Sequence, residues 1–178
     1  MTRLRGHIVT PLSPEAAFAF VADFANSALW DPGVATSERI DSGPVAVGAR
    51  YRLAVRFGGR TAPMEYRISV LEVPTRVVLT GQGSGVSAVD EIAFEPAGTG
   101  TRIDYMADIQ LGGAMRLVQP FLGRTFAALA RDALAGMQQA LDRLARTGND
   151  GPTPTGDHEA ADHEAADREA ADREAGLS

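Results

Sequence analysis

A lone aspartate, Asp90, falls on the apolar phase of a segment that alternates like a β-strand. It shares this phase with Ala88, Ile92 and Phe94, so its carboxyl group should face the protein interior. Desolvation would raise the pKa of a buried carboxyl group, which suits it to general acid or base catalysis. Two other arrangements stay open: a bulge that turns Asp90 outward, and an ion pair between Asp90 and an arginine.

The three tyrosines of the chain, Tyr51, Tyr66 and Tyr105, also fall on apolar phases. Their hydroxyl groups could together orient a carbonyl or phenol group of a bound molecule. The alternative is structural, because large sheets commonly bury tyrosine rings with the hydroxyl group at the rim. If the site is catalytic, we expect Asp90 and Tyr66 to serve as its acid and base.

Cysteine, lysine and histidine offer little chemistry in this chain. It has no cysteine, and all 17 basic residues are arginines, which excludes thiol nucleophiles, zinc-thiolate sites and lysine Schiff bases. His7 alternates with Arg5 and should be exposed. His158 and His163 lie five positions apart, unlike the four-position spacing of helical zinc motifs. We therefore predict neither a metal site nor a cofactor.

Charge divides the chain into a neutral part and an acidic tail. The net charge is −6: residues 1–150 carry 15 arginines and 15 acidic residues, whereas residues 151–178 carry two arginines and eight acidic residues. A neutral domain lacks the basic surface that nucleic acids require, so we predict no nucleic-acid partner. We expect a folded domain over residues 1–147 and a flexible acidic linker with a five-residue-repeat tail over residues 148–178.

Local signals predict one strand, two short helices and then a run of strands. Residues 3–10 alternate as a strand, and Ser13-Pro14-Glu15 matches the start of a helix that should reach about Phe24. A second short helix over residues 26–30 should stop before Pro32, because the residue preceding proline avoids helical geometry. From Val34 onward, apolar and polar residues alternate with a period of two, as in β-strands. The strands that we expect there cover residues 50–57, 64–70, 76–80, 86–95 and 101–111.

The strand over residues 50–57 separates an apolar face from a basic one. Four arginines of this strand and its neighbour are predicted to form a solvated outer face rather than an anion site; they are Arg50, Arg52, Arg56 and Arg67. Gly58-Gly59 predicts a hairpin, and residues 81–85 predict a flexible break. Short loops between consecutive strands imply an antiparallel meander.

A long helix is expected from about Gly113 to Arg146. Its apolar positions recur at spacings of three and four and are Val118, Leu122, Phe126, Leu129, Ala133, Met137, Leu141 and Leu144. Pro120 and Gly123 should weaken its first turns. We expect this helix to lie along the concave side of the sheet, with an apolar hollow between the two.

Five short motifs accompany this order of elements. They are Ser13-Pro14-Glu15, Trp30-Asp31-Pro32-Gly33, Val47-Gly48, Phe94-Glu95-Pro96 and Gly98-Thr99-Gly100-Thr101-Arg102. Their order and spacing over about residues 3–146 resemble the SRPBCC superfamily, also called START-like or helix-grip, and within it the polyketide cyclase/dehydrase-like proteins. The resemblance implies an α+β helix-grip fold: a seven-stranded curved antiparallel sheet wrapped around a long C-terminal helix, with two short helices between strands 1 and 2.

The resemblance also implies a cavity for an apolar or amphipathic small molecule. The residues that we expect to line this ligand-binding cavity are Trp30, Tyr51, Leu53, Val55, Phe57, Met64, Tyr66, Ile68, Asp90, Ile92, Phe94, Ile103, Tyr105, Leu122 and Phe126. For Trp30 the alternative is a structural anchor at the end of the second short helix.

Three functions stay open as hypotheses. The first is binding of a hydrophobic small molecule, such as a polyketide, a lipid or an aromatic compound, and the second is a polyketide cyclase or dehydratase. The third is a protein whose cavity is filled by its own side chains and which acts through surface contacts or as a homodimer. No segment has the apolar length of a signal peptide or membrane span, so we expect a cytoplasmic protein.

Overall fold

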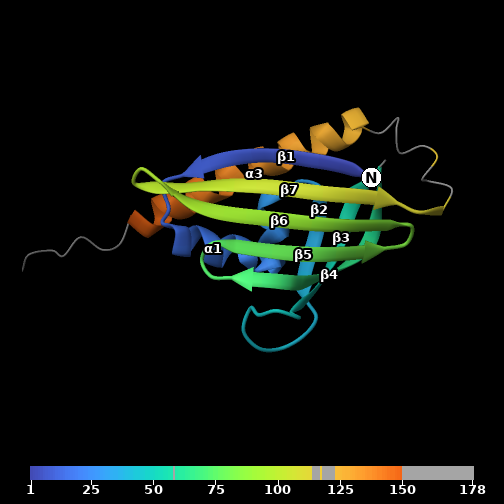
Figure 1. Ribbon diagram of the computed structural model, residues 1–178, viewed down its shortest axis with the longest axis horizontal. Coiled ribbons are helices and arrows are strands. Elements are labelled where there is room, and N and C mark those ends of the chain that lie inside the picture. Colours follow the sequence, from blue (N-terminus) through green and yellow to red (C-terminus); the bar gives the residue numbers. More distant parts are fainter. Residues whose placement is uncertain (58, 114–116, 118–122, 150–178) are drawn as a thin grey trace, which may run out of the picture. The chain divides into compact units, whose positions relative to one another are not determined.

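The computed structural model describes residues 1–57, 59–113, 117 and 123–149 (Figure 1). Its strands are β1 (Thr2–Thr10), β2 (Val34–Arg39), β3 (Arg50–Phe57), β4 (Arg60–Glu72), β5 (Arg76–Gly83), β6 (Val86–Ala97) and β7 (Gly100–Leu111). They form one seven-stranded sheet in the order β1-β7-β6-β5-β4-β3-β2, with every pair antiparallel. The predicted meander is therefore confirmed, and the first strand pairs with the last.

The two short helices between β1 and β2 are also confirmed. Helix α1 (Pro14–Ala22) begins after Ser13, whose hydroxyl oxygen accepts a hydrogen bond from the Ala16 amide at 3.3 Å. It ends before the predicted Phe24, because Asp23 leaves helical geometry and its carboxylate accepts from the Ala25 amide. A 3₁₀ turn, η1 (Phe24–Asn26), and helix α2 (Ser27–Trp30) follow.

The break predicted over residues 81–85 is shorter than expected, because only Ser84 and Gly85 lie between β5 and β6. Gly81 and Gly83 belong to β5, where they pair with Tyr66 and Met64 of β4. The glycine at position 81 serves packing, because a Cβ atom there would lie 2.6 Å from the Tyr66 ring. The ring of Tyr66 thus occupies the space that a side chain at position 81 would take.

The long C-terminal helix is confirmed as α3 (Gly123–Asn149). Its predicted first turns, with Val118, Pro120 and Leu122, lie outside the described residues. The described part of the predicted apolar stripe is buried or half-buried and consists of Phe126, Leu129, Ala133, Met137, Leu141 and Leu144. Figure 1 shows α3 and α1 behind the sheet.

The core lies between the sheet and these helices. Aromatic rings hold much of it together: Phe18 packs edge-on against Phe94 with ring centroids 5.2 Å apart, and Phe24 lies 5.1 Å from Tyr66. Met137 and Leu141 of α3 join the same cluster. Residues Met1–Arg146 form one compact unit, and the predicted tail lies outside the described residues from position 150 onward.

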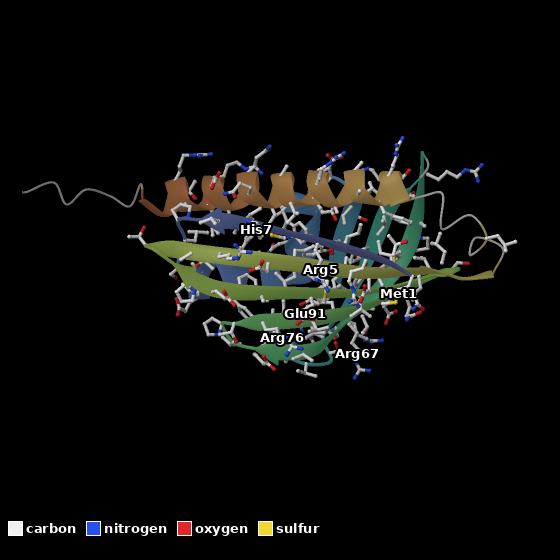
Figure 2. The ribbon with its side chains drawn as sticks, turned by 45° about the horizontal axis from the view of Figure 1, so that its top comes forward. Met1, Arg5, His7, Arg67, Arg76 and Glu91 are labelled. Atoms are coloured by element: carbon white, nitrogen blue, oxygen red, sulfur yellow. The ribbon has the colours of Figure 1, made fainter. Side chains whose placement is uncertain are left out.

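The opposite face of the sheet is polar. Figure 2 shows Arg5, His7, Arg76 and Glu91 along it, and Arg76 donates to Glu91 at 2.8 Å. His7 is exposed, as predicted, and so are the four arginines expected on the outer face. In the described part of the chain, no helix has the length and apolarity to cross a membrane.

Candidate functional site

A cavity of about 120 Å³ lies between the concave face of the sheet and α3. Its walls come from β1, β2, β3, β4, β6, β7, the turn η1, the segment after α2 and one face of α3. The residues lining it are Leu4, Phe24, Asp31, Gly33, Val34, Leu53, Val55, Arg56, Tyr66, Ala88, Asp90, Tyr105, Ala107, Ile109, Leu129, Ala130 and Ala133. Most of these side chains are apolar, so the few polar groups among them define what the cavity can recognise.

Asp90 is the buried charge of this cavity. Its side chain follows the inward phase of β6 between Ala88 and Ile92, and the residue is only 3% exposed. The Tyr105 hydroxyl donates to Asp90 Oδ1 at 2.7 Å, whereas Oδ2 has no hydrogen-bond partner among the described residues. Asp90 thus neither turns outward nor pairs with a described arginine, the two alternatives that the sequence left open.

Burial has the largest effect on the pKa of Asp90. It raises the pKa of this carboxyl group to about 6, although the hydroxyl groups of Tyr105 and Tyr66 lower it. The Tyr105 contact has the geometry of a full hydrogen bond, while Tyr66 approaches the same carboxyl group more loosely. A carboxyl group with this pKa can exchange a proton near neutral pH.

Tyr66 and Tyr105 face the cavity as neutral phenols. Burial, with the neighbouring charge of Asp90, raises the pKa of both hydroxyl groups well above its ordinary value. Both residues can therefore donate a hydrogen bond but do not ionise at neutral pH. The Tyr66 ring is fixed between Gly81 and Phe24.

Asp31 brings a second carboxyl group to the same cavity. It follows α2 in a tight turn, where its Oδ1 accepts from the Gly33 amide at 2.7 Å and its own amide donates to the Ser27 carbonyl at 2.8 Å. Burial raises the pKa of Asp31, against the Gly33 hydrogen bond and the charge of Arg56, which lower it. Its negative charge in turn raises the pKa of Asp90.

Arg56 holds this turn in place. One guanidinium nitrogen donates to the carbonyl groups of Pro32 and Val34, each at 2.8 Å, and the Arg56 amide donates to the Gly33 carbonyl at 2.7 Å. The side chain is exposed, so the cavity reaches solvent at this residue. The cation thus stands at the rim, and its Nη1 nitrogen is committed to two backbone oxygens.

The structure brings together five of the predicted site residues and separates the others. Leu53, Val55, Tyr66, Asp90 and Tyr105 line the cavity. The others whose side chains are described pack elsewhere and do not line it; they are Trp30, Tyr51, Met64, Ile68, Ile92, Phe94, Ile103 and Phe126. Leu122 and the side chain of Phe57 lie outside the described part of the chain.

Of the two alternatives for the three tyrosines, the structural one applies to Tyr51, which does not line the cavity with Tyr66 and Tyr105. Tyr51 is fully buried beneath η1, with its ring 6.2 Å from Phe24 and the guanidinium of Arg39 5.9 Å from its centroid. Trp30 packs edge-on against Phe24 at 6.0 Å and so takes the structural role that the sequence offered as its alternative.

Asp31 is the functional candidate that the sequence reasoning missed. Its Trp-Asp-Pro-Gly motif was visible, but the residue stands in a turn where no alternation of apolar residues indicates which way a side chain points. Ala88, Ala107 and Ile109 could have been found, because they share the inward strand phase with Asp90 and Tyr105.

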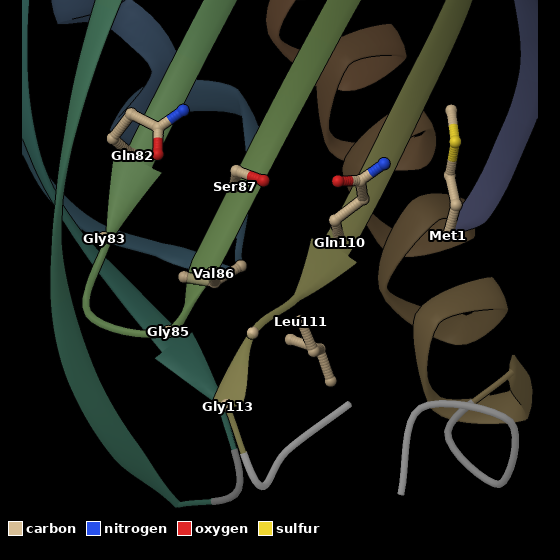
Figure 3. A pocket seen from close by; sticks show the side chains of 10 residues that line it. Met1, Gln82, Gly83, Gly85, Val86, Ser87, Gln110, Leu111 and Gly113 are labelled. Carbon is tan, nitrogen blue, oxygen red and sulfur yellow. The ribbon is translucent and has the colours of Figure 1, made fainter. Parts of the chain in front are cut away.

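Two larger hollows lie on other surfaces. One of about 520 Å³ sits where the β5–β6 hairpin meets the end of β7, and Figure 3 shows Gln82, Ser87 and Gln110 beside it. These three residues pair across neighbouring strands on the outer face. The other, of about 400 Å³, lies on the outer face around Arg5, His7 and Asp104. Both are more open and lack a buried charged group, so the smaller internal cavity is the stronger candidate.

Within the described residues, no three carboxylate or imidazole groups come close enough to hold a metal ion. The chemistry that the cavity can support therefore rests on two carboxyl groups and two phenols. Together they can orient a polar group of a bound molecule and move a proton.

The sheet wrapped around a long C-terminal helix defines a helix-grip protein. A family model described as "Polyketide cyclase / dehydrase and lipid transport" matches residues 1–148, and the chain belongs to this family. Among curated proteins, none matches the chain.

Solved structures share the fold at low sequence identity. The protein TTHA0849 from Thermus thermophilus is 16% identical, with a TM-score of 0.66 over 82% of this chain and 99% of that one. A START superfamily protein from Mycobacterium smegmatis is also 16% identical, with a TM-score of 0.64 over 83% of this chain and 99% of that one. The di-domain ARO/CYC protein BexL from the BE-7585A biosynthetic pathway is 15% identical, with a TM-score of 0.64 over 82% of this chain and 48% of that one. The predicted fold and superfamily are confirmed.

Proposed function

We propose that this protein binds a small, mainly apolar molecule in the cavity between the sheet and α3. The observation that carries the proposal is an apolar-lined space of about 120 Å³ in a core that is otherwise filled by side chains. Native cores contain few voids, because each one forfeits packing contacts. The description of the family, which includes lipid transport, supports the same function.

The volume limits what fits inside. Pockets for drug-sized ligands span roughly 300–1,000 Å³, whereas a cavity of about 150 Å³ in another protein accepts benzene. The enclosed part of a ligand should therefore be one aromatic ring or a short alkyl chain. Burying about 150 Å² of apolar surface yields about 4 kcal/mol, so apolar contact alone supports a Kd on the order of 1 mM.

Toluene tests the proposal directly. We expect it to shift the methyl NMR signals of Val55 and Ile109 in the full chain, in a saturable manner. Ala107→Leu should abolish this effect, because Ala107 is buried in the cavity wall and a larger side chain would fill the space.

Ala93→Leu is the matched control. Ala93 lies on the opposite face of the sheet, and the same enlargement there should leave toluene binding unchanged. The proposal is wrong if toluene gives no saturable shifts, or if Ala107→Leu binds toluene as the unmodified protein does. An empty result would favour the hypothesis of a protein that acts through its surface.

A second candidate function is the dehydration of a β-hydroxy carbonyl compound, as in polyketide cyclases and dehydratases. It is favoured by the raised pKa of Asp90 and by the two phenols beside it. The Asp90 carboxylate would remove the proton from the carbon next to the carbonyl group. Tyr66 would give its proton to the hydroxyl group that leaves as water, and a carbon–carbon double bond forms. Transfer of the proton from Asp90 to Tyr66 restores the starting state.

The two functions differ in one variant. Asp90→Asn keeps the shape of the side chain, so an enzyme should lose turnover of a β-hydroxy thioester while retaining binding. Absence of turnover by the unmodified protein across a panel of such compounds would count against the enzyme. Homodimer formation, cytoplasmic location and the absence of nucleic-acid binding stay predictions from the sequence.

A further inference from the structure

We propose that the molecule bound in this cavity presents a hydrogen-bond donor at its polar end, held between Asp90 and Asp31, and that carboxylate ligands are rejected. The inference rests on the proposed binding function and adds the chemical class of the ligand. It follows from a count of donors and acceptors around the cavity and from the signs of the charges there.

Asp90 provides the first acceptor. Its Oδ1 is already paired with the Tyr105 hydroxyl, but its Oδ2 is buried and has no partner among the described residues. A buried carboxylate oxygen without a partner is costly, because it has lost water and gained nothing in return. A donor on the ligand would remove this cost on binding.

Asp31, in the turn after α2, provides the second acceptor. Its Oδ1 accepts from the Gly33 amide, and the hydrogen-bonded turn around it fixes the orientation of the carboxyl group. The second oxygen of the carboxylate has further acceptor capacity. Asp31 and Asp90 therefore offer acceptors to the same space.

Donors are scarcer in the cavity. The Tyr105 proton is directed at Asp90, and the Arg56 nitrogen nearest the turn donates to the Pro32 and Val34 carbonyl groups. Tyr66 is the remaining phenol, and it already lies near the Asp90 carboxyl group. Apart from Arg56, whose other N–H groups stand at the exposed rim, acceptors thus outnumber free donors, so a ligand that supplies a donor is complementary to the cavity.

The charges around the cavity also favour a ligand that donates a hydrogen bond over one that carries a carboxylate. Asp31 and Asp90 both become negative when ionised, and Asp132 on α3 adds a further negative charge that acts on Asp31. The opposing cation is Arg56, which stands at the exposed rim. A carboxylate ligand would introduce another negative charge into a poorly solvated space, whereas an ammonium or hydroxyl group would be complementary.

Four single-ring compounds of similar size separate these possibilities: benzylamine, benzyl alcohol, toluene and benzoate. Binding to the full chain would be measured at pH 8 by NMR titration. We expect benzylamine and benzyl alcohol to bind about tenfold or more tightly than toluene, since a hydrogen bond to a charged group contributes about 1.5–3 kcal/mol. Benzoate should bind more weakly than toluene.

Two cavity variants and one surface control assign the preference to its residues. Asp90→Asn and, independently, Asp31→Asn should each reduce the advantage of benzylamine over toluene, without weakening toluene binding. Asp104→Asn removes a carboxylate that is paired with Arg102 outside this cavity, and it should leave the order of affinities unchanged.

The possible results test the preference for a hydrogen-bond donor separately from ligand binding itself. If toluene binds as tightly as the alcohol and the amine, or if benzoate binds equally well, the cavity is a ligand site but the donor inference is wrong. If none of the four compounds binds, both are wrong. If the advantage of benzylamine survives both aspartate variants, the donor is recognised elsewhere and the inference is overturned.

Discussion

The Tyr105 hydroxyl donates a hydrogen bond to Asp90 Oδ1 at 2.7 Å across the β6–β7 pair. The two residues are diagonal neighbours on the concave face, since Asp90 stands opposite Ala107 and Tyr105 stands opposite Ile92. An aromatic side chain is long enough to span this diagonal. The contact satisfies one oxygen of a buried carboxyl group and leaves the other without a hydrogen-bond partner among the described residues.

Removing the Tyr105 hydroxyl should destabilise the ionised form of Asp90. We expect Tyr105→Phe to lower the free energy of unfolding by about 1–3 kcal/mol at pH 8, and by less at pH 4, where Asp90 is protonated. Urea denaturation at the two pH values measures the difference. Tyr51→Phe is the control, because its hydroxyl group lies outside the cavity; equal pH profiles for the two variants would contradict the prediction.

Asp90 should make the protein less stable as the pH rises. Its folded-state pKa, about 6, lies above the ordinary value of 3.8, so the folded state binds the proton more tightly than the unfolded state. The stabilisation is fully present below about pH 4 and is lost as the pH rises through 6, with a total of about 3 kcal/mol. Asp90→Asn should remove this slope. The test compares unfolding free energies of the two proteins from pH 4 to 8, and parallel curves would refute the assignment.

Asp31 and Asp90 should be coupled through their charges. Because the negative charge of Asp31 raises the pKa of Asp90, Asp31→Asn should lower it. A titration of the Asp90 side-chain carboxyl carbon by NMR would measure the change. Asp104→Asn provides the comparison, since that residue is engaged with Arg102 and is not among the causes of the Asp90 shift. An unchanged or higher pKa in Asp31→Asn would contradict the coupling.

Alternation along the strands predicts which face a residue occupies but not where along that face a cavity lies. It correctly placed Asp90, Tyr66 and Tyr105 on the concave side. The same rule selected Ile68 and Phe94, which share that face and are packed in the core. The difference depends on which helix side chains fill the space above each position, and no local pattern in a strand contains that information.

Turns are harder to interpret than strands, for a related reason. Asp31 points into the cavity because hydrogen bonds with Gly33, Ser27 and Arg56 fix its turn, and one of these partners comes from β3, a different element. Such orientation is set by contacts between distant parts of the chain. Sequence alone could identify the Trp-Asp-Pro-Gly motif but not the direction of its carboxyl group.

The position of α3 over this turn depends on a glycine. A Cβ atom at Gly136 would collide with the Trp30 carbonyl oxygen and would also lie 3.2 Å from the Pro32 ring. The carbonyl belongs to the backbone at the end of α2, which a hydrogen bond from the Asp31 amide to the Ser27 carbonyl holds in place. The helix therefore approaches the Asp31 turn more closely than any side chain would allow.

Gly136→Ala should consequently destabilise the protein, although alanine is the better helix former by up to about 1 kcal/mol. We expect a net loss of about 1–3 kcal/mol in the free energy of unfolding, as for other insertions into a packed interior. Ala135→Gly, at the exposed neighbouring position, should cost only its helix propensity, about 1 kcal/mol.

Because the displaced turn contains Asp31, Gly136→Ala should also weaken benzylamine binding more than toluene binding, whereas Ala135→Gly should affect neither. A more stable Gly136→Ala protein would show that α3 does not lie against Trp30 as described.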